Sequence, residues 1–161
     1  MNSLVDISKV ILNSKKIGIT YHVSPDGDAV GSALALLNGL KYLNKDAYLI
    51  SKDIISDNLQ FLKSSSEGNG LITSPSCDTD TVVVVDCGNF ERISAELKNF
   101  KGTIINIDHH LSNNKYGKIN EELSDPLIVK YFELNNKYHF KVNMECADVL
   151  RGELLNKVWL G

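Results

Sequence analysis

TVVVVD at residues 81–86 and TIINID at residues 103–108 are the two stretches that decide the fold. Each is a short run of mostly β-branched apolar residues that ends in an aspartate. Such runs are typical of strands buried on both faces, because a strand covered on one face only alternates apolar and polar side chains. The two runs therefore predict two central strands of a parallel sheet.

The segments around these strands alternate between helical and extended periodicity. Helices are predicted over residues 4–12, 29–43, 57–63 and 90–100, and further strands over 16–22 and 47–51. Asp57 is expected to cap the third helix, and the Ser- and Gly-rich residues 64–80 predict a surface loop. Strands that alternate with helices predict the α/β fold class, with an open, mostly parallel sheet and helices on both faces.

The length of the chain and its sequence pattern indicate a single domain. A chain of 161 residues is of the usual size for one domain. We expect residues 1–120 to form its core and residues 121–161 to be a divergent or truncated C-terminal segment of the same domain. In that segment LIVKYFEL predicts a helix, YHFKV a strand and residues 144–155 a helix.

Composition argues against several classes of protein. The chain has 17 Lys and Arg against 20 Asp and Glu, with no basic block of the kind that binds duplex nucleic acid. Its three cysteines form no CxxC pair, which argues against a disulfide scaffold and favours the cytoplasm. No apolar run approaches the roughly 18 residues that a membrane span needs, and the first residues lack an export signal. We therefore expect a cytoplasmic protein without a membrane partner.

Histidines and aspartates lie at the ends of three predicted strands or in the turn after the first. Seven side chains share this placement: His22, Asp26, Asp28, Asp86, Asp108, His109 and His110. One such residue alone is usually a cap or a turn residue. Because parallel strands carry their carboxyl ends to the same edge of a sheet, we expect the seven to meet there.

Four carboxylates in one cleft need compensating positive charge. Each pair repels by about 1 kcal/mol at 4 Å even in bulk water, and by more when partly buried. Oxygen and imidazole ligands without thiolate suit manganese, magnesium, iron or zinc, and manganese is the middle choice among them. Six or seven ligands exceed the need of one catalytic ion, so the sequence predicts two ions bridged by a carboxylate, roughly 3.5–4 Å apart.

Three motifs carry a resemblance to a known family. They are HVSPDGDAVGS at 22–32, VVVVDCGNFER at 82–92 and NIDHH at 106–110. In order and spacing they resemble the first three motifs of the DHH phosphoesterase family, and most closely its oligoribonuclease, phosphoadenosine phosphate phosphatase and cyclic-dinucleotide phosphodiesterase members. The resemblance covers residues 1 to about 115.

The resemblance implies a role for each residue of the cluster. One manganese ion would be held by His22, Asp26 and Asp86, and the second by Asp28, Asp86 and His109. Asp108 would orient a ligand histidine, and His110 would face the phosphate.

The resemblance also implies a substrate-binding surface. A helix starting near Ala29 would offer free backbone N–H groups, with Gly31 and Ser32 allowing a close approach of the phosphate. Arg92 would pair with a phosphate oxygen, or is a solvated helix residue.

The chain departs from the family pattern after residue 115. Family members carry a fourth metal-binding aspartate and a second domain with a GGGH loop. Asn156 stands where the aspartate is expected, and the surroundings of Asp125 and Asp148 do not match. A weakly held second ion and a poor grip on substrate are the expected consequences.

Two functions follow as hypotheses. The first is a manganese-dependent phosphoesterase that hydrolyses short oligonucleotides or small nucleotides by a two-metal mechanism. The alternative is a catalytically impaired metal- or nucleotide-binding module. A dinucleotide-binding oxidoreductase is disfavoured, because no GxGxxG follows the first strand. The apolar stretch LLNKVWL could cover a core or pair two chains into a homodimer.

Overall fold

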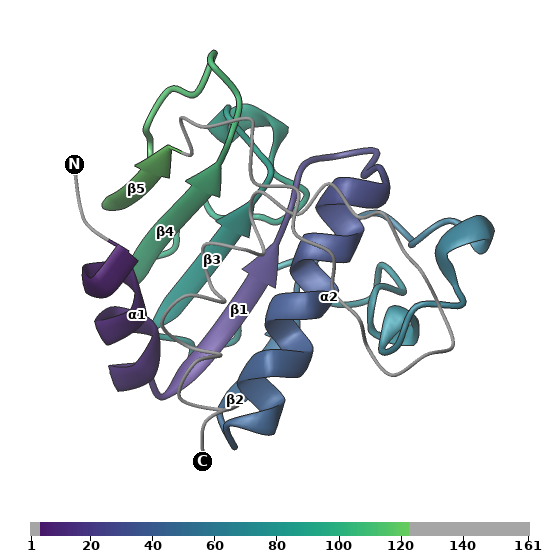
Figure 1. The fold of residues 1–161 in the computed structure, drawn as a ribbon, viewed down its shortest axis with the longest axis horizontal. Coiled ribbons are helices and arrows are strands. Elements are labelled where there is room, and N and C mark those ends of the chain that lie inside the picture. Colours follow the sequence, from purple (N-terminus) through teal and green to yellow (C-terminus); the bar gives the residue numbers. More distant parts are fainter. Residues whose placement is uncertain (1–3, 123–161) are drawn as a thin grey trace.

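A five-stranded parallel sheet organises the chain. The computed structural model describes residues 4–122, and in this range the strands are ordered β2-β1-β3-β4-β5, with every neighbouring pair parallel (Figure 1). The strands are β1 (Lys16–Thr20), β2 (Asp46–Leu49), β3 (Thr81–Val85), β4 (Thr103–Asp108) and β5 (Ile119–Glu122). Every residue of β3 is buried, as its continuous apolar sequence predicts.

Two α-helices cover one face of this sheet. They are α1 (Leu4–Asn13) and α2 (Gly27–Tyr42), and both lie on the same side of the sheet in Figure 1. Ile7 and Ile11 of α1 and the apolar stripe of α2 share one core cluster with Ile19, Val83 and Ile107 of the strands. These alternate strand residues therefore point toward the helices.

The opposite face is covered mainly by extended chain. Val82 and Val84 of β3 pack there against a segment that follows β3 and begins with the 3₁₀ helix η3 (Phe90–Arg92). Two more 3₁₀ helices, η1 (Asp57–Leu59) and η2 (Ser65–Glu67), lie in the connection between β2 and β3. No helix among the described residues is long and apolar enough to cross a membrane.

The α/β class with a parallel sheet is confirmed. Helices were expected on both faces, but among the described residues both α-helices cover one face and extended chain covers most of the other. Two of the predicted helices are also wrong. Residues 57–63 contain only η1, whose N-cap is Ser56 rather than Asp57. The predicted helix over 90–100 ends after η3, because the following backbone bonds to other segments instead of to itself. Ser94 N–H donates to the Tyr21 carbonyl, and Glu96 N–H donates to the Thr73 carbonyl.

Other differences concern the ends of the chain. Strand β5 was not predicted, since INEE lacks the apolar alternation of a strand. Residues 64–80 form a loop apart from η2, as expected. The predicted helices and strand between residues 127 and 155 lie outside the described residues.

The order of the strands makes the chain diverge at the carboxyl edge, between β1 and β3. From β1 the chain passes through α2 to β2 on one side, and it then returns to place β3 on the other side of β1. The segment after β1 therefore runs over one face of the sheet and the segment after β3 over the other. Ligand sites in open α/β sheets form where neighbouring strands diverge in this way.

We expect Leu37→Ala to test the packing of α2 on the sheet. Leu37 is fully buried, so its truncation should lower the free energy of unfolding by about 2–5 kcal/mol. Tyr42→Ala truncates a large side chain of the same helix that is 70% exposed, and it should change the value by no more than about 0.5 kcal/mol. Urea denaturation measures both, and equal losses would contradict this packing.

Candidate metal centre

The structure brings the predicted histidines and aspartates together at the carboxyl edge of the sheet. His22 lies just beyond β1, where it forms an isolated bridge with Ile93. Asp86 directly follows β3, and His109 and His110 directly follow β4. The remaining carboxylates come from the first turn of α2 and from the end of β4.

Asp86 is at the centre of this cluster. Its buried carboxylate has Oδ2 3.8 Å from His22 Nε2 and Oδ1 3.2 Å from His109 Nε2. Oδ1 is also 3.7 Å from His110 Nδ1. The carboxylate thus faces histidines from two different strand ends.

The first group of possible ligands consists of His22, Asp26 and Asp86. His22 Nδ1 is 2.8 Å from the Val23 carbonyl and donates to it, which leaves Nε2 as an acceptor directed at the carboxylates. Asp26 Oδ1 caps α2 by accepting from Asp28 N–H and Ala29 N–H. Asp26 thus belongs both to the helix cap and to the cluster, and the cap fixes its side chain relative to α2.

The second group consists of Asp86, His109 and His110. Asp28 adjoins it, with Oδ2 3.7 Å from His109 Nε2. The three residues that the family resemblance implies for the second ion, Asp28, Asp86 and His109, are therefore in contact, and His110 lies beside them.

Asp108 supports His110. The Asp108 side chain is fully buried, and its Oδ1 lies 2.7 Å from His110 Nδ1. Its Oδ2 accepts from the backbone N–H of His110 at 3.2 Å. With Nδ1 held in this way, the half-exposed ring of His110 has a fixed orientation.

Burial and mutual repulsion raise the pKa of the central carboxyls. For Asp28, burial and then the Asp86 charge raise the pKa to about 6. Burial raises the pKa of Asp86 as well, although His109 and His110 act in the opposite direction. Such groups are poised to exchange a proton for a metal cation.

One orphaned atom shows that these residues fit a cation. Asp86 Oδ1 is buried and has no hydrogen-bond partner. A buried carboxylate oxygen without a partner is costly, and a divalent cation held by oxygen and imidazole ligands would satisfy it. The two groups contain only carboxylate and imidazole ligands and no thiolate, a ligand set that suits manganese or magnesium.

The predicted substrate-binding residues lie near the cluster but have other contacts. Ser32 is buried, and its hydroxyl donates to Asp28 Oδ1 at 3.3 Å. Arg92 is exposed, and its carbonyl accepts from Val23 N–H in the loop that follows β1. Gly31 lies on α2, which begins at Gly27 rather than near Ala29. Because Asp26 already bonds two N–H groups of the first turn, these are not free for a phosphate.

Sequence reasoning missed a group of polar residues behind the centre. Asn106, Asn113 and Tyr116 bond to one another and to the chain that follows Asp86. The signal for Asn106 was present, since a polar residue interrupts the apolar run TIINI. For the other two, which lie in a loop, the sequence carried no comparable signal.

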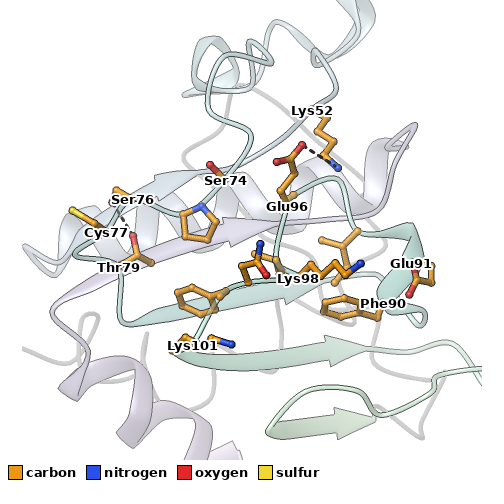
Figure 2. A pocket seen from close by; sticks show the side chains of 17 residues that line it. Lys52, Ser74, Ser76, Cys77, Thr79, Phe90, Glu91, Glu96, Lys98 and Lys101 are labelled. Atoms are coloured by element: carbon orange, nitrogen blue, oxygen red, sulfur yellow. Dashed lines mark hydrogen bonds and ion pairs between the residues drawn. The ribbon is translucent and has the colours of Figure 1, made fainter.

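A separate groove of about 760 Å³ lies on the sheet face opposite α1 and α2. Figure 2 shows it lined by Phe90, Lys98 and Lys101, with an ion pair between Lys52 and Glu96 at its edge. None of the predicted site residues lines it. The candidate centre is thus distinct from this concavity.

The raised pKa of Asp28 predicts how metal binding depends on pH. Without metal, the folded protein keeps the Asp28 proton up to about pH 6, whereas the unfolded chain releases it near 3.8. Raising the pH through this interval therefore lowers the contribution of Asp28 to stability. A cation that binds there must displace the same proton, so the affinity for metal rises over this interval.

We expect the Mn²⁺ affinity of the wild type to rise by roughly tenfold per pH unit for each proton displaced, up to about pH 6. Asp28→Asn removes one titrating group, so its binding should be weaker and its slope shallower. Calorimetric titrations between pH 5 and 7 measure both slopes, and identical slopes would contradict the assignment.

Similarity to known proteins covers the part of the chain that carries these side chains. A family model described as "DHH family, N-terminal domain" matches residues 16–148. The chain is 35% identical over 103 residues to the bifunctional oligoribonuclease and PAP phosphatase NrnA of Thermus thermophilus, an alignment that spans 64% of this chain and 30% of the relative.

A solved structure gives the same picture. The crystal structure of an exopolyphosphatase-related protein from Bacteroides fragilis matches with a TM-score of 0.63 and 27% identity, over 74% of this chain and 38% of the other. The chain therefore spans about a third of the length of these relatives. The resemblance predicted from three motifs is confirmed: the chain belongs to the DHH family.

Proposed function

We propose that this chain is a phosphoesterase that uses two divalent cations, with manganese as the preferred ion, to hydrolyse short oligonucleotides or small nucleotides. The observation that carries the proposal is the Asp86 carboxylate, which is buried, has one unpartnered oxygen and belongs to both groups of possible ligands. A carboxylate shared by two ions is what a two-metal site requires.

The side chains of the cluster divide between the two cations. His22 and Asp26 would hold the first cation together with Asp86, and Asp28 and His109 would hold the second together with the same carboxylate. When bound, the pair of ions supplies positive charge to phosphoryl oxygens and lowers the pKa of a water molecule for attack on phosphorus.

His110 and Asp108 would act on the phosphate. Asp108 holds His110 Nδ1 at 2.7 Å, so the imidazole is oriented before substrate arrives. In its imidazolium form, its exposed edge would donate to a phosphoryl oxygen and offset the charge that develops there. Arg92, whose carbonyl accepts from Val23 N–H in the loop that follows β1, would add a positive side chain on the substrate side.

The relatives support small phosphorylated substrates. One is named as an oligoribonuclease and PAP phosphatase, and the other as exopolyphosphatase-related. With a net charge of −3 and no basic block, the chain is suited to a short strand or a nucleotide rather than to a duplex. We further propose that it acts in the cytoplasm and pairs into a homodimer, which sedimentation would detect.

The alternative is a metal- or nucleotide-binding module with little turnover. One observation favours it: Asn156 stands where the family resemblance places a metal-binding aspartate. Calorimetry distinguishes the two functions, because the module would bind one ion tightly without turnover.

We expect turnover to require a divalent cation. The full chain should hydrolyse at least one member of a panel of dinucleotides and nucleotide phosphomonoesters with Mn²⁺ present, lose the activity in excess chelator and regain it when Mn²⁺ is restored. Release of nucleoside monophosphate or inorganic phosphate is the measurement. Activity that is insensitive to chelator would refute the proposal.

Asp86→Asn should separate metal binding from stability. The variant removes the shared negative charge, so binding of both ions should fall below detection by calorimetry. Without metal it should be at least as stable as the wild type at neutral pH, because a desolvated carboxylate is replaced by a neutral amide. Asn also tolerates the positive φ of 51° at this position.

Asp78→Asn is the matched control. Asp78 is exposed, lies in the loop that precedes β3 and pairs with Lys16 of β1. The Asp78→Asn variant should therefore bind Mn²⁺ like the wild type. Normal Mn²⁺ binding by Asp86→Asn would show that Asp86 is not a ligand.

A further inference from the structure

Asn106 is a polar residue in the buried middle of β4. It pairs in register with Val84 of β3 and is fully buried. A buried amide is costly unless it is hydrogen-bonded, and this one is bonded at both ends. Its Nδ2 donates to the Cys87 carbonyl and to Tyr116 Oη, each at 3.0 Å, and its Oδ1 accepts from Asn113 Nδ2 at 2.8 Å.

The Tyr116 hydroxyl closes this network. It donates to the same Cys87 carbonyl at 2.6 Å, so that this oxygen accepts two hydrogen bonds. The Tyr116 ring contacts Phe90 edge to face, with centroids 5.6 Å apart. Packing and hydrogen bonding thus hold one backbone carbonyl from two directions.

That carbonyl belongs to the residue directly after Asp86. Asp86 has a φ of 51°, a conformation that few residues other than glycine adopt. Its own N–H donates to the Ile107 carbonyl at 3.0 Å, so the backbone is held on both sides of it. Asp86 Oδ1 has no hydrogen-bond partner, and the position of this oxygen therefore depends on the backbone.

The same network reaches the loop that follows β4. Asn113 N–H donates to the His110 carbonyl at 3.0 Å, and Asn114 N–H donates to the Gly88 carbonyl at 2.8 Å. The two loops are also in close contact, since a Cβ added at Gly88 would lie 3.2 Å from Asn113 Cα. The loop with Asp86 and the loop with the histidines are thereby joined.

We infer that Asn106 and Tyr116 are positioning residues, which set the placement of the Asp86 carboxylate relative to His109 and His110. The inference rests on the proposed function in that the placement matters for binding cations. Neither residue contacts a cation or a substrate in this assignment. They act through the Cys87 carbonyl and the Asn113 side chain.

Tyr116→Phe and Tyr48→Phe form a matched pair of variants. Both tyrosines pack on the same apolar cluster, and each loses a hydroxyl that bonds to a loop. The Tyr48 hydroxyl bonds Thr79 Oγ1 and accepts from Ser76 N–H, in the loop before β3 at the opposite edge of the sheet. General loss of stability should therefore affect both variants alike.

The first readout is the affinity for Mn²⁺ in calorimetric titration. Tyr116→Phe should weaken binding by about tenfold or more, which is the usual effect of removing a partner behind the ligands. Tyr48→Phe should bind like the wild type. Wild-type affinity in Tyr116→Phe, or an equal loss in Tyr48→Phe, would overturn the inference.

The second readout is amide hydrogen exchange in the metal-free protein. Tyr116→Phe should speed exchange at Asp86 and Asn114, while Tyr48→Phe should speed it at Ser76 only. The two readouts separate failure of the proposed function from failure of the inference. If the wild type binds no Mn²⁺, the proposed function fails, and the exchange comparison alone decides the inference. If the wild type binds Mn²⁺ and turns over substrate but the two variants match it, only the inference fails. Asn106→Leu should show the larger effect, and Tyr116→Phe decides the matter if that variant does not fold.

Discussion

A buried carboxylate with no hydrogen bond to one of its oxygens underlies the whole site. Asp86 is buried, adopts a positive φ and has its pKa raised by burial. An asparagine would fit this position without a buried charge, so the fold bears an electrostatic penalty there. A bound cation would offset that penalty, because the neighbouring histidines and carboxylates match the ligands of a divalent cation.

The parallel sheet explains how distant residues reach one place. Strands β1, β3 and β4 are adjacent and parallel, so the residues that follow them emerge at one edge. The chain diverges there, with α2 on one face and the segment containing η3 on the other. Asp26 links the helix to the cluster, since it caps α2 and lies 4.0 Å from His22 Nε2. The candidate site and the fold therefore rest on shared residues.

Much of this arrangement could be predicted from sequence because it is encoded locally. The strands 81–85 and 103–108 follow from runs of β-branched residues, and the meeting of His22, Asp86 and His109 follows from their places after parallel strands. The segment 90–100 could not be predicted in the same way. Its apolar spacing resembles a helix, but its backbone bonds to Tyr21 and Thr73, and such tertiary pairing leaves no local pattern.

The finer contacts of the site were also beyond the sequence. The pairing of Asp108 with His110 and the placement of Tyr116 are set by loop geometry. Strand β5 owes its position to pairing with β4 rather than to its own composition. The bond of Tyr116 to Cys87 and the pairing of β5 with β4 join segments that a periodicity does not relate.

Crystals grown with Mn²⁺ and measured at the manganese absorption edge would test the central claim most directly. We expect two anomalous peaks at the carboxyl edge of the sheet, both in contact with the Asp86 carboxylate. His22 should contact one peak and His109 the other. Saturating Mn²⁺ with no peak beside Asp86, or a peak held by other residues alone, would contradict it.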